Sequence, residues 1–155
     1  MVVVDFTERQ WAIIHKEAQR RHEKFANIPS NYGTTRNYHN DLVGVAGEAA
    51  VHKYTDIPWT GYGNDHATDL LGLEVRTRTT PGGRLCIHDK EEADGIFIGQ
   101  KFVLCWYNAD QTVTIVGWTY YSQITRLGIR INGRTYIATR DLHETETLRL
   151  ECQTT

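Results

Sequence analysis

The 155-residue sequence has few of the residues that mark specialised folds: it contains three cysteines, three prolines and one methionine. The cysteines, Cys86, Cys105 and Cys152, are odd in number and lack CxxC spacing, which disfavours a disulfide-stapled or zinc-ribbon fold. No apolar run is long enough to cross a bilayer, and the opening MVVVDF is too short for a secretory signal. We therefore expect a reduced, intracellular protein of the cytoplasm that does not enter a membrane.

The sequence also lacks a strong excess of charge of either sign. Its formal net charge is -2 at pH 7 and its pI is near 6.4, so binding of a polyanion would require a local basic patch. It has no glycine-rich phosphate loop and no GxSxG sequence, and its seven histidines show no HxxxH spacing. The motifs of P-loop proteins, serine hydrolases and zinc peptidases are therefore missing.

Two helices are expected in the first third of the chain. Thr7 and Gln10 resemble a capping box, and apolar residues recur at helical spacing up to Phe25, which predicts an amphipathic helix over about 7–27. Its outer, solvated face is expected to carry Lys16, Arg20, Arg21 and Lys24. A loop follows, and a second helix is expected over 42–54, capped by Asp41 and ending before Pro58.

From residue 65 onward the sequence favours strands, near 66–70, 73–79, 84–88, 101–107 and 112–118. DKEEAD (89–94) is expected to be an acidic turn or short helix, and GIFIGQ (95–100) an extension of the fourth strand. Asn132-Gly133 predicts a later hairpin, because a type I′ turn needs positive φ at both residues. We predict one α/β domain over 1–155, a mixed central sheet flanked by helices. It comprises an N-terminal helix and loop (1–40), a core (41–125) and an extra C-terminal hairpin with a tail (126–155).

The second helix contains an isolated acid. From Leu42 to Val51 the only charged residue is Glu48, and a helix that is apolar nearly all round is buried. A buried carboxylate needs a partner. An arginine, a backbone amide and a divalent metal ion all remain open as that partner.

The stretch DLLGLEVRTR (69–78) places two more acids beside cations. If Leu71 and Gly72 form a two-residue turn, Asp69 lies directly opposite Glu74, with Cβ atoms ~5 Å apart. Leu73, Val75 and Thr77 then share the covered face, and Glu74, Arg76 and Arg78 share the other. Two opposed carboxylates repel each other unless a cation lies between them, and oxygen ligands suit Mg²⁺ or Mn²⁺. A solvated strand with alternating charges is the competing interpretation.

GVAGEAAV (44–51) and DLLGLEVRTR (69–78) resemble the motifs of the PD-(D/E)XK nuclease superfamily, especially its small phage and prokaryotic members. KFVLCWYN (101–108) and VTIVGWTYYSQI (113–124) are similar to the downstream strands and the GW turn of such proteins, so the resemblance covers about 41–125. It implies the restriction-endonuclease-like core αβββαβ, DNA as partner, a possible homodimer and, for a phage protein, the host cytoplasm.

The resemblance also implies roles for single residues. Asp69 and Glu74 correspond to the strand acids that hold Mg²⁺ (or Mn²⁺), Glu48 to the helix acid that assists, and Val75 to the residue whose carbonyl binds the metal. Arg76 stands where the family has lysine. Arginine cannot act as a base, although it binds phosphate bidentately. The other phosphate-binding candidates are Arg36, Arg78, Arg84 and Arg134.

Because of Arg76, the sequence leaves three functions open. The preferred one is metal-dependent hydrolysis of DNA phosphodiester bonds, with Glu48, Asp69, Glu74 and Arg76 as catalytic residues and water activated by the metal, alone or with the help of Lys101. The second is an inactive DNA-binding module on the same fold. The third is a structural or interaction protein of a phage.

Overall fold

The computed structural model describes residues 1–25, 37–61, 68–92 and 99–153, and in these it contains two sheets. The central sheet has the order β1-β5-β4-β2, and its strands are β1 (Val2–Val4), β5 (Val113–Tyr120), β4 (Lys101–Tyr107) and β2 (Leu73–Arg78). The second sheet has the order β3-β7-β6, with β3 (Leu85–His88), β7 (Arg134–Ile137) and β6 (Ile129–Ile131). Only the β2–β4 pair is parallel among the pairs described.

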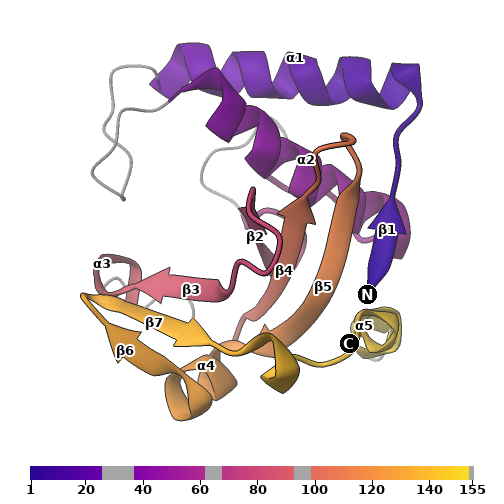
Figure 1. Ribbon diagram of the computed structural model, residues 1–155. Helices are drawn as coiled ribbons and strands as arrows, with labels where there is room; N and C mark the ends of the chain where they lie inside the picture. Colours follow the sequence, from indigo (N-terminus) through magenta and orange to yellow (C-terminus); the bar gives the residue numbers. More distant parts are fainter. Residues whose placement is uncertain (26–36, 62–67, 93–98, 154–155) are drawn as a thin grey trace.

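Two long helices lie on one side of the central sheet (Figure 1): α1 (Glu8–Phe25) packs along α2 (Tyr38–Thr55), and α2 packs on β2, β4 and β5. The shorter elements are α3 (Asp89–Glu92), α4 (Tyr121–Leu127), a 3-10 turn (Thr139–Asp141) and α5 (Thr145–Gln153). Figure 1 places α5 beside β1, so the two ends of the described chain are close together. The chain is therefore a mixed α/β protein, as the sequence predicts.

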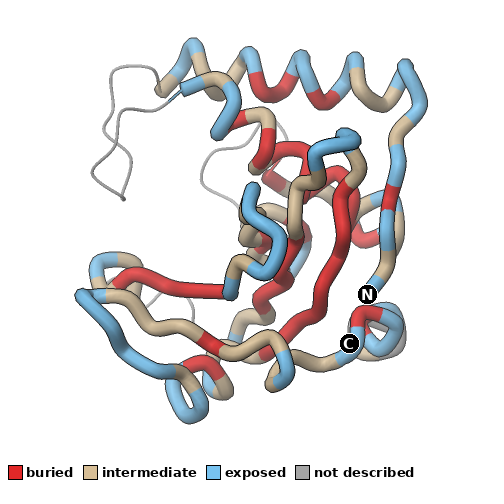
Figure 2. The backbone as a smooth tube through the Cα atoms, viewed as in Figure 1, coloured by how far each residue is buried: buried red, intermediate tan, exposed pale blue. Residues whose placement is uncertain are grey.

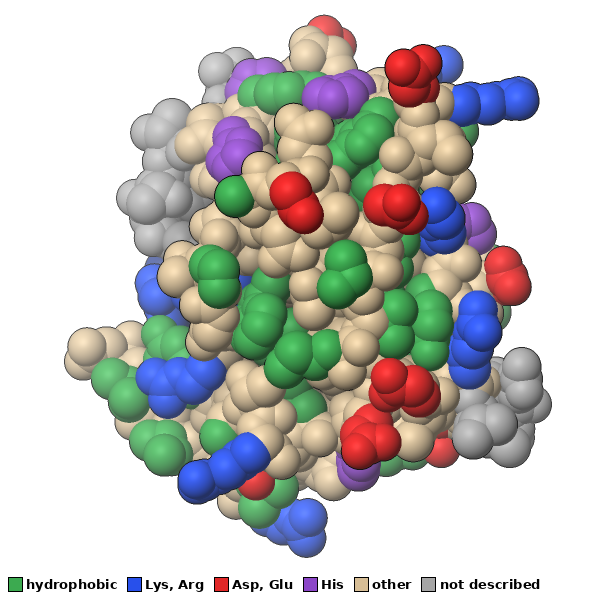
Figure 3. Space-filling view, turned by 45° about the vertical axis from the view of Figure 1, so that its right-hand side comes forward, with side chains coloured by type: hydrophobic (Ala, Val, Ile, Leu, Met, Phe, Trp, Pro, Cys, Tyr) green, Lys and Arg blue, Asp and Glu red, His purple; other side chains and the backbone are tan. Residues whose placement is uncertain are grey.

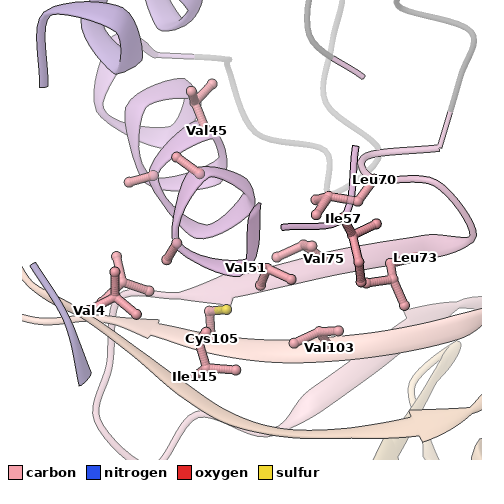
Figure 4. Close-up of a cluster of buried hydrophobic side chains, with 14 of the residues drawn as sticks. Val4, Val45, Val51, Ile57, Leu70, Leu73, Val75, Val103, Cys105 and Ile115 are labelled. Carbon is pink, nitrogen blue, oxygen red and sulfur yellow. The ribbon is translucent and has the colours of Figure 1, made fainter. Parts of the chain in front are cut away.

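The core consists of two clusters, one on each face of β4 and β5; β5 is buried along nearly its whole length and β4 over its central residues (Figure 2). Toward α2, Val103 and Cys105 of β4 pack with Val51 of the helix (Figure 4). On the other face, Phe102 and Leu104 join a cluster that includes residues of β3, β7 and α4. Alternation along β4 thus supplies both clusters, because successive side chains of a strand point to opposite faces.

Several local predictions are confirmed. Thr7 Oγ1 accepts from the Gln10 amide at 3.2 Å while Gln10 Oε1 accepts from the Thr7 amide at 2.9 Å, a complete capping box. Asn132 and Gly133 have φ of 49° and 77° and join β6 to β7. Four of the five expected strands and the short acidic helix α3 are present. The C-terminal hairpin therefore exists, but it pairs with β3, so it belongs to a second sheet.

Other predictions are wrong. The expected 84–88 strand does not join the central sheet, where β1 is present instead and pairs with β5. The second helix begins at Tyr38 with Asn37 as its cap, so Asp41 lies inside the helix, buried. Gly117 and Trp118 lie within β5 and form no turn; a side chain on Gly117 would clash with the backbone of residue 143, which pairs with Trp118.

The expected strand over 66–70 shrinks to a single bridge. Residues 66 and 67 lie outside the described chain, Asp69 is in a bend, and only Leu70 pairs, with Leu73 across the Leu71-Gly72 turn. The extension of the fourth strand by GIFIGQ is wrong for Gly99 and Gln100, which precede β4, and 95–98 lie outside the described residues. The ladder beside β2 is therefore shorter than expected.

None of the helices in the described part of the chain combines the length and the apolar character that crossing a membrane requires. The face that carries β1 and α5 shows small hydrophobic groups separated by polar and acidic side chains, with Lys and Arg at its margins (Figure 3). Met1 and Val3 are among the exposed apolar residues. Of the described residues, this face presents no continuous positive surface to a polyanion.

Candidate functional site

A close approach of α2 to β2 places the first acid of the site. Gly47 of α2 packs against Thr77 of β2, and a Cβ added to Gly47 would lie only 1.8 Å from Thr77 Oγ1. The backbone carbonyl of Gly47 also faces Cys105 Sγ of β4 at 4.0 Å. Because the next residue is Glu48, this contact fixes where the Glu48 carboxylate enters the interior, where it is 3 % exposed.

Asp69 lies beside Glu48 and interacts with Glu74. Asp69 Oδ2 accepts a hydrogen bond from the Val75 amide at 2.7 Å, and the charges of Asp69 and Glu74 act on each other. A methyl group on Gly61 would touch both the Asp69 backbone and Glu48 Oε1. Of the three acids that the sequence singled out, Glu48 and Asp69 therefore lie close together; Asp69 is in a bend and not in a paired strand, and Glu74 projects from the face of β2 that points away from α2.

The pKa values of these acids reflect burial and mutual repulsion. Burial, and then the charge of Asp69, raises the pKa of Glu48 to about 7. Burial and the charge of Glu74 raise the pKa of Asp69 to about 7, against the opposing hydrogen bond from Val75. Burial also raises the pKa of Glu74. A cation close to Asp69 and Glu74 would favour their charged forms and so oppose these pKa increases.

Arg21 is a residue of the candidate site that the sequence analysis placed wrongly. It was expected on the solvated face of the first helix, yet its side chain is 16 % exposed and donates to Glu48 from Nη1 at 2.6 Å and from Nη2 at 3.0 Å. Its position was signalled by spacing: Arg21 follows Ile14 by seven residues and Ala18 by three, so it lies on the apolar stripe. The sequence left an arginine, a backbone amide and a divalent metal ion open as the partner of Glu48. In the structure an arginine, Arg21, is a partner of Glu48.

Two further groups hold the Glu48 and Arg21 pair. Trp59 Nε1 donates to Glu48 Oε1 at 3.2 Å, and Arg21 Nε donates to Glu17 Oε1 at 2.9 Å. Glu17 is itself 2 % exposed and also binds Arg20. Burial by itself would lower the pKa of Arg21, but the hydrogen bonds and charges of Glu48 and Glu17 raise it overall, so the guanidinium is a permanent cation.

Arg76 lies on the face of β2 that carries Glu74, as predicted, and is held by a residue that the sequence analysis did not select. Its Nη1 donates to Glu91 Oε1 at 2.8 Å, and its guanidinium lies 5.6 Å from the ring centre of Phe102. Glu91 Oε2 also accepts from the His88 amide at 3.0 Å. Glu91 of the short helix α3 therefore fixes the Arg76 guanidinium, which lies on the same face of β2 as Glu74.

The other basic candidates lie farther away or outside the described chain. Arg78 is four residues beyond Glu74, ~13 Å along the strand, and donates to Cys86 Sγ at 3.6 Å. Arg84 is exposed and lies over the Tyr136 ring at 4.9 Å. Arg36 is not among the described residues. Lys101 pairs with Leu73, on the α2 face of the sheet, whereas Glu74 projects from the opposite face.

The residues present fit a small, hard divalent cation. Among the described residues no group of three or more His, Cys, Asp or Glu side chains is placed so that it could hold a metal ion. Mg²⁺, however, takes only one or two carboxylates and keeps several waters. Asp69 and Glu74, whose charges act on each other, would supply the two carboxylates.

Comparison of the chain with protein-family models, with curated proteins and with solved structures finds no match.

Proposed function

We propose that this protein is a metal-dependent nuclease that hydrolyses DNA phosphodiester bonds on a restriction-endonuclease-like core. The single observation that supports this most strongly is that Asp69 lies close to Glu48, about the same Gly61, and feels the charge of Glu74, with Arg76 on the same strand as Glu74. One buried and two half-buried acids with like charge raise one another's energy, and a structural role would be served better by neutral side chains. A bound cation would offset the negative charge of these acids and could bind an anionic substrate.

Each acidic side chain has its own role in this proposal. Asp69 and Glu74 would hold Mg²⁺ or Mn²⁺, with the Val75 carbonyl as a further ligand, and the ion when bound would polarise a phosphoryl oxygen and lower the pKa of water. The Val75 amide fixes the Asp69 carboxylate by its 2.7 Å hydrogen bond. Glu48, engaged by Arg21, adds negative charge behind Asp69.

Arg76 would bind the scissile phosphate. Its guanidinium stays charged at every working pH, so it cannot remove a proton from water, but it stabilises negative charge that grows on the phosphoryl oxygens. Glu91 holds Nη1 and thereby orients the guanidinium. Arg78 and Arg84, farther along β2 and at the start of β3, would contact neighbouring phosphates.

A second candidate function has its own support. Glu48 is paired with Arg21, and Arg76 is paired with Glu91 at 2.8 Å, so two members of the site already have charge partners in the protein. Such pairing favours a DNA-binding module that has no hydrolytic activity. The two functions differ in one measurable result, which is cleavage.

The test is nicking of supercoiled plasmid in Mn²⁺ by the wild type and by Asp69→Asn. Asparagine keeps an oxygen for the Val75 amide but removes the charge, so the fold should persist and nicking should be lost. Asp110→Asn, in the exposed loop between β4 and β5, is the matched control and should cut like the wild type. Equal nicking by wild type and Asp69→Asn would refute the proposal that the protein is a nuclease. Binding of the plasmid without nicking would favour the DNA-binding module.

A further inference from the structure

The second sheet turns one face toward the core and the other away from it. Leu85 and Ile87 of β3 and Ile137 of β7 belong to the buried cluster. Successive residues of a strand project to opposite faces, and residues opposed across two strands share a face. The outer face, opposite the cluster, therefore carries two rows of side chains: Cys86, Tyr136 and Ile129 in one, and His88, Arg134 and Ile131 in the next.

Exposure increases across the outer face from β3 to β6 (Figure 2). Cys86 and His88 of β3 are buried, the residues of β7 on this face are half-buried, and Ile129 and Ile131 of β6 are 62 % and 44 % exposed. Ile129 is paired directly with Tyr136. The two isoleucines and the tyrosine thus form an accessible apolar strip on a sheet surface.

Two arginines border this strip. The Arg84 guanidinium lies 4.9 Å from the ring centre of Tyr136, and Arg78 Nη1 donates to Cys86 Sγ at 3.6 Å. Within the described part of the chain, neither arginine has a carboxylate partner. Their positive charge is therefore available to an anion that lies along the strip.

The outer face is connected to Arg76 through one carboxylate. Glu91 Oε1 accepts from Arg76 Nη1 at 2.8 Å, and Glu91 Oε2 accepts from the His88 amide at 3.0 Å. His88 pairs with Arg134 across β3 and β7. A strand of DNA whose phosphate lies at Arg76 would therefore have the outer face beside it.

Building on the proposed function, we propose that the outer face binds single-stranded DNA and that the nuclease acts on an unpaired strand. Arg78 and Arg84 would bind phosphates, and the apolar strip would contact the faces of the bases. A duplex stacks its base faces inside the helix and offers a flat protein surface only phosphates, sugars and groove edges. An unpaired strand offers charge to the arginines and base faces to the strip, which is the combination that single-strand binding surfaces use.

The test is the binding of labelled oligonucleotides, followed by fluorescence anisotropy in EDTA so that no metal-dependent cleavage occurs. Wild type should bind a short single strand more tightly than a duplex of the same length, and more tightly than an abasic strand, which keeps the phosphates but has no bases. The double variant Ile129→Thr/Ile131→Thr should bind the normal strand about tenfold more weakly and the abasic strand as wild type does.

The double variant should fold, because both isoleucines are exposed and threonine is also β-branched. Val3→Thr is the matched control: Val3 is an apolar strand residue that is 65 % exposed, but it lies in β1 of the central sheet. It should bind all three oligonucleotides as wild type does.

The arginines are tested through salt dependence. Loss of one phosphate contact lowers the slope of log K against log salt concentration by ~0.7 for a single strand, so Arg84→Gln should show this decrease. Arg9→Gln is the control, because Arg9 is an exposed residue of α1, on the other side of the central sheet (Figure 1). An unchanged slope in Arg84→Gln would overturn the role of Arg84.

The outcomes separate this inference from the proposed function. Equal affinity of wild type for the normal and abasic strands, tighter binding of the duplex, or unchanged affinity in the double variant would overturn the inference and leave plasmid nicking to test the nuclease. A dimer, measured by light scattering, that the double variant loses while its DNA binding is unchanged would assign the face to a second copy of the chain and overturn the inference. Base-dependent binding by a protein that nicks no plasmid would support the outer face as a DNA site and overturn only the proposed hydrolysis.

Discussion

Replacing Gly47 and Gly44 with alanine, one at a time, tests the packing that positions Glu48. Both glycines lie in α2, so each substitution gains about 0.4–1 kcal/mol from reduced backbone entropy and better helix propensity. They differ in their surroundings: an added Cβ at Gly44 meets nothing within 4 Å, whereas at Gly47 it would lie 1.8 Å from Thr77 Oγ1 and 3.0 Å from Thr77 Cβ.

The clash at Gly47 should outweigh the helix gain. Thr77 is β-branched and part of β2, so its side chain has little freedom to withdraw, and overpacking of this kind costs about 1–3 kcal/mol. We expect Gly44→Ala to stabilise the protein and Gly47→Ala to destabilise it relative to Gly44→Ala by about the cost of overpacking. Urea unfolding followed by circular dichroism measures both free energies of unfolding.

A second substitution, Thr77→Ala, should relieve the clash that Gly47→Ala creates. It removes Oγ1 and Cγ2, so the penalty of Gly47→Ala should shrink in this background by about 0.5–3 kcal/mol, the range typical of residues in contact. Equal free energies of unfolding for Gly44→Ala and Gly47→Ala would refute the close approach of α2 to β2. The position argued for Glu48 would then be wrong as well.

Two further predictions concern the site directly. Arg76→Lys keeps a cation at the phosphate and should retain plasmid nicking within about tenfold, whereas Arg76→Met should lower the rate about 10²–10³-fold; similar rates for the two variants would contradict a charge-stabilising role. Trp59 donates to Glu48, next to Asp69, so paramagnetic Mn²⁺ should quench its emission; Trp59→Phe should remove most of the Mn²⁺-dependent change in tryptophan fluorescence. Unchanged quenching in Trp59→Phe would place the ion elsewhere.

The parts of the site that follow from local geometry could be predicted. Alternation along 73–78 correctly put Leu73 and Val75 under α2 and Glu74 and Arg76 on the other face, because the two-residue period of a strand leaves no other choice. The Leu71-Gly72 turn and its Leu70–Leu73 bridge are likewise confirmed. Their common feature is that the interacting residues are close in sequence.

The parts that depend on distant residues could not be predicted in the same way. Glu91 is 15 residues from Arg76, and Arg21 is 27 residues from Glu48. The pairing of β3 with β7 likewise joins residues about 50 apart in the sequence. A charged residue at such a separation has many possible partners, so composition and spacing cannot choose among them. The sequence nevertheless contained an indication that Arg21 is buried, because Arg21 lies on the apolar face of its helix.

Because Arg21 lies in α1, the candidate site extends beyond the region 41–125 and includes the first helix. The resemblance covered 41–125, which left the first helix outside the functional core, but α1 supplies the guanidinium that neutralises Glu48. Removing one partner of a buried ion pair costs about 3–5 kcal/mol, a large share of the stability of a small protein. Glu48 is tolerable at 3 % exposure only while α1 is packed on α2, unless a metal ion takes the place of Arg21. The N-terminal helix and Glu48 are therefore energetically one unit, so α1 belongs to the candidate site.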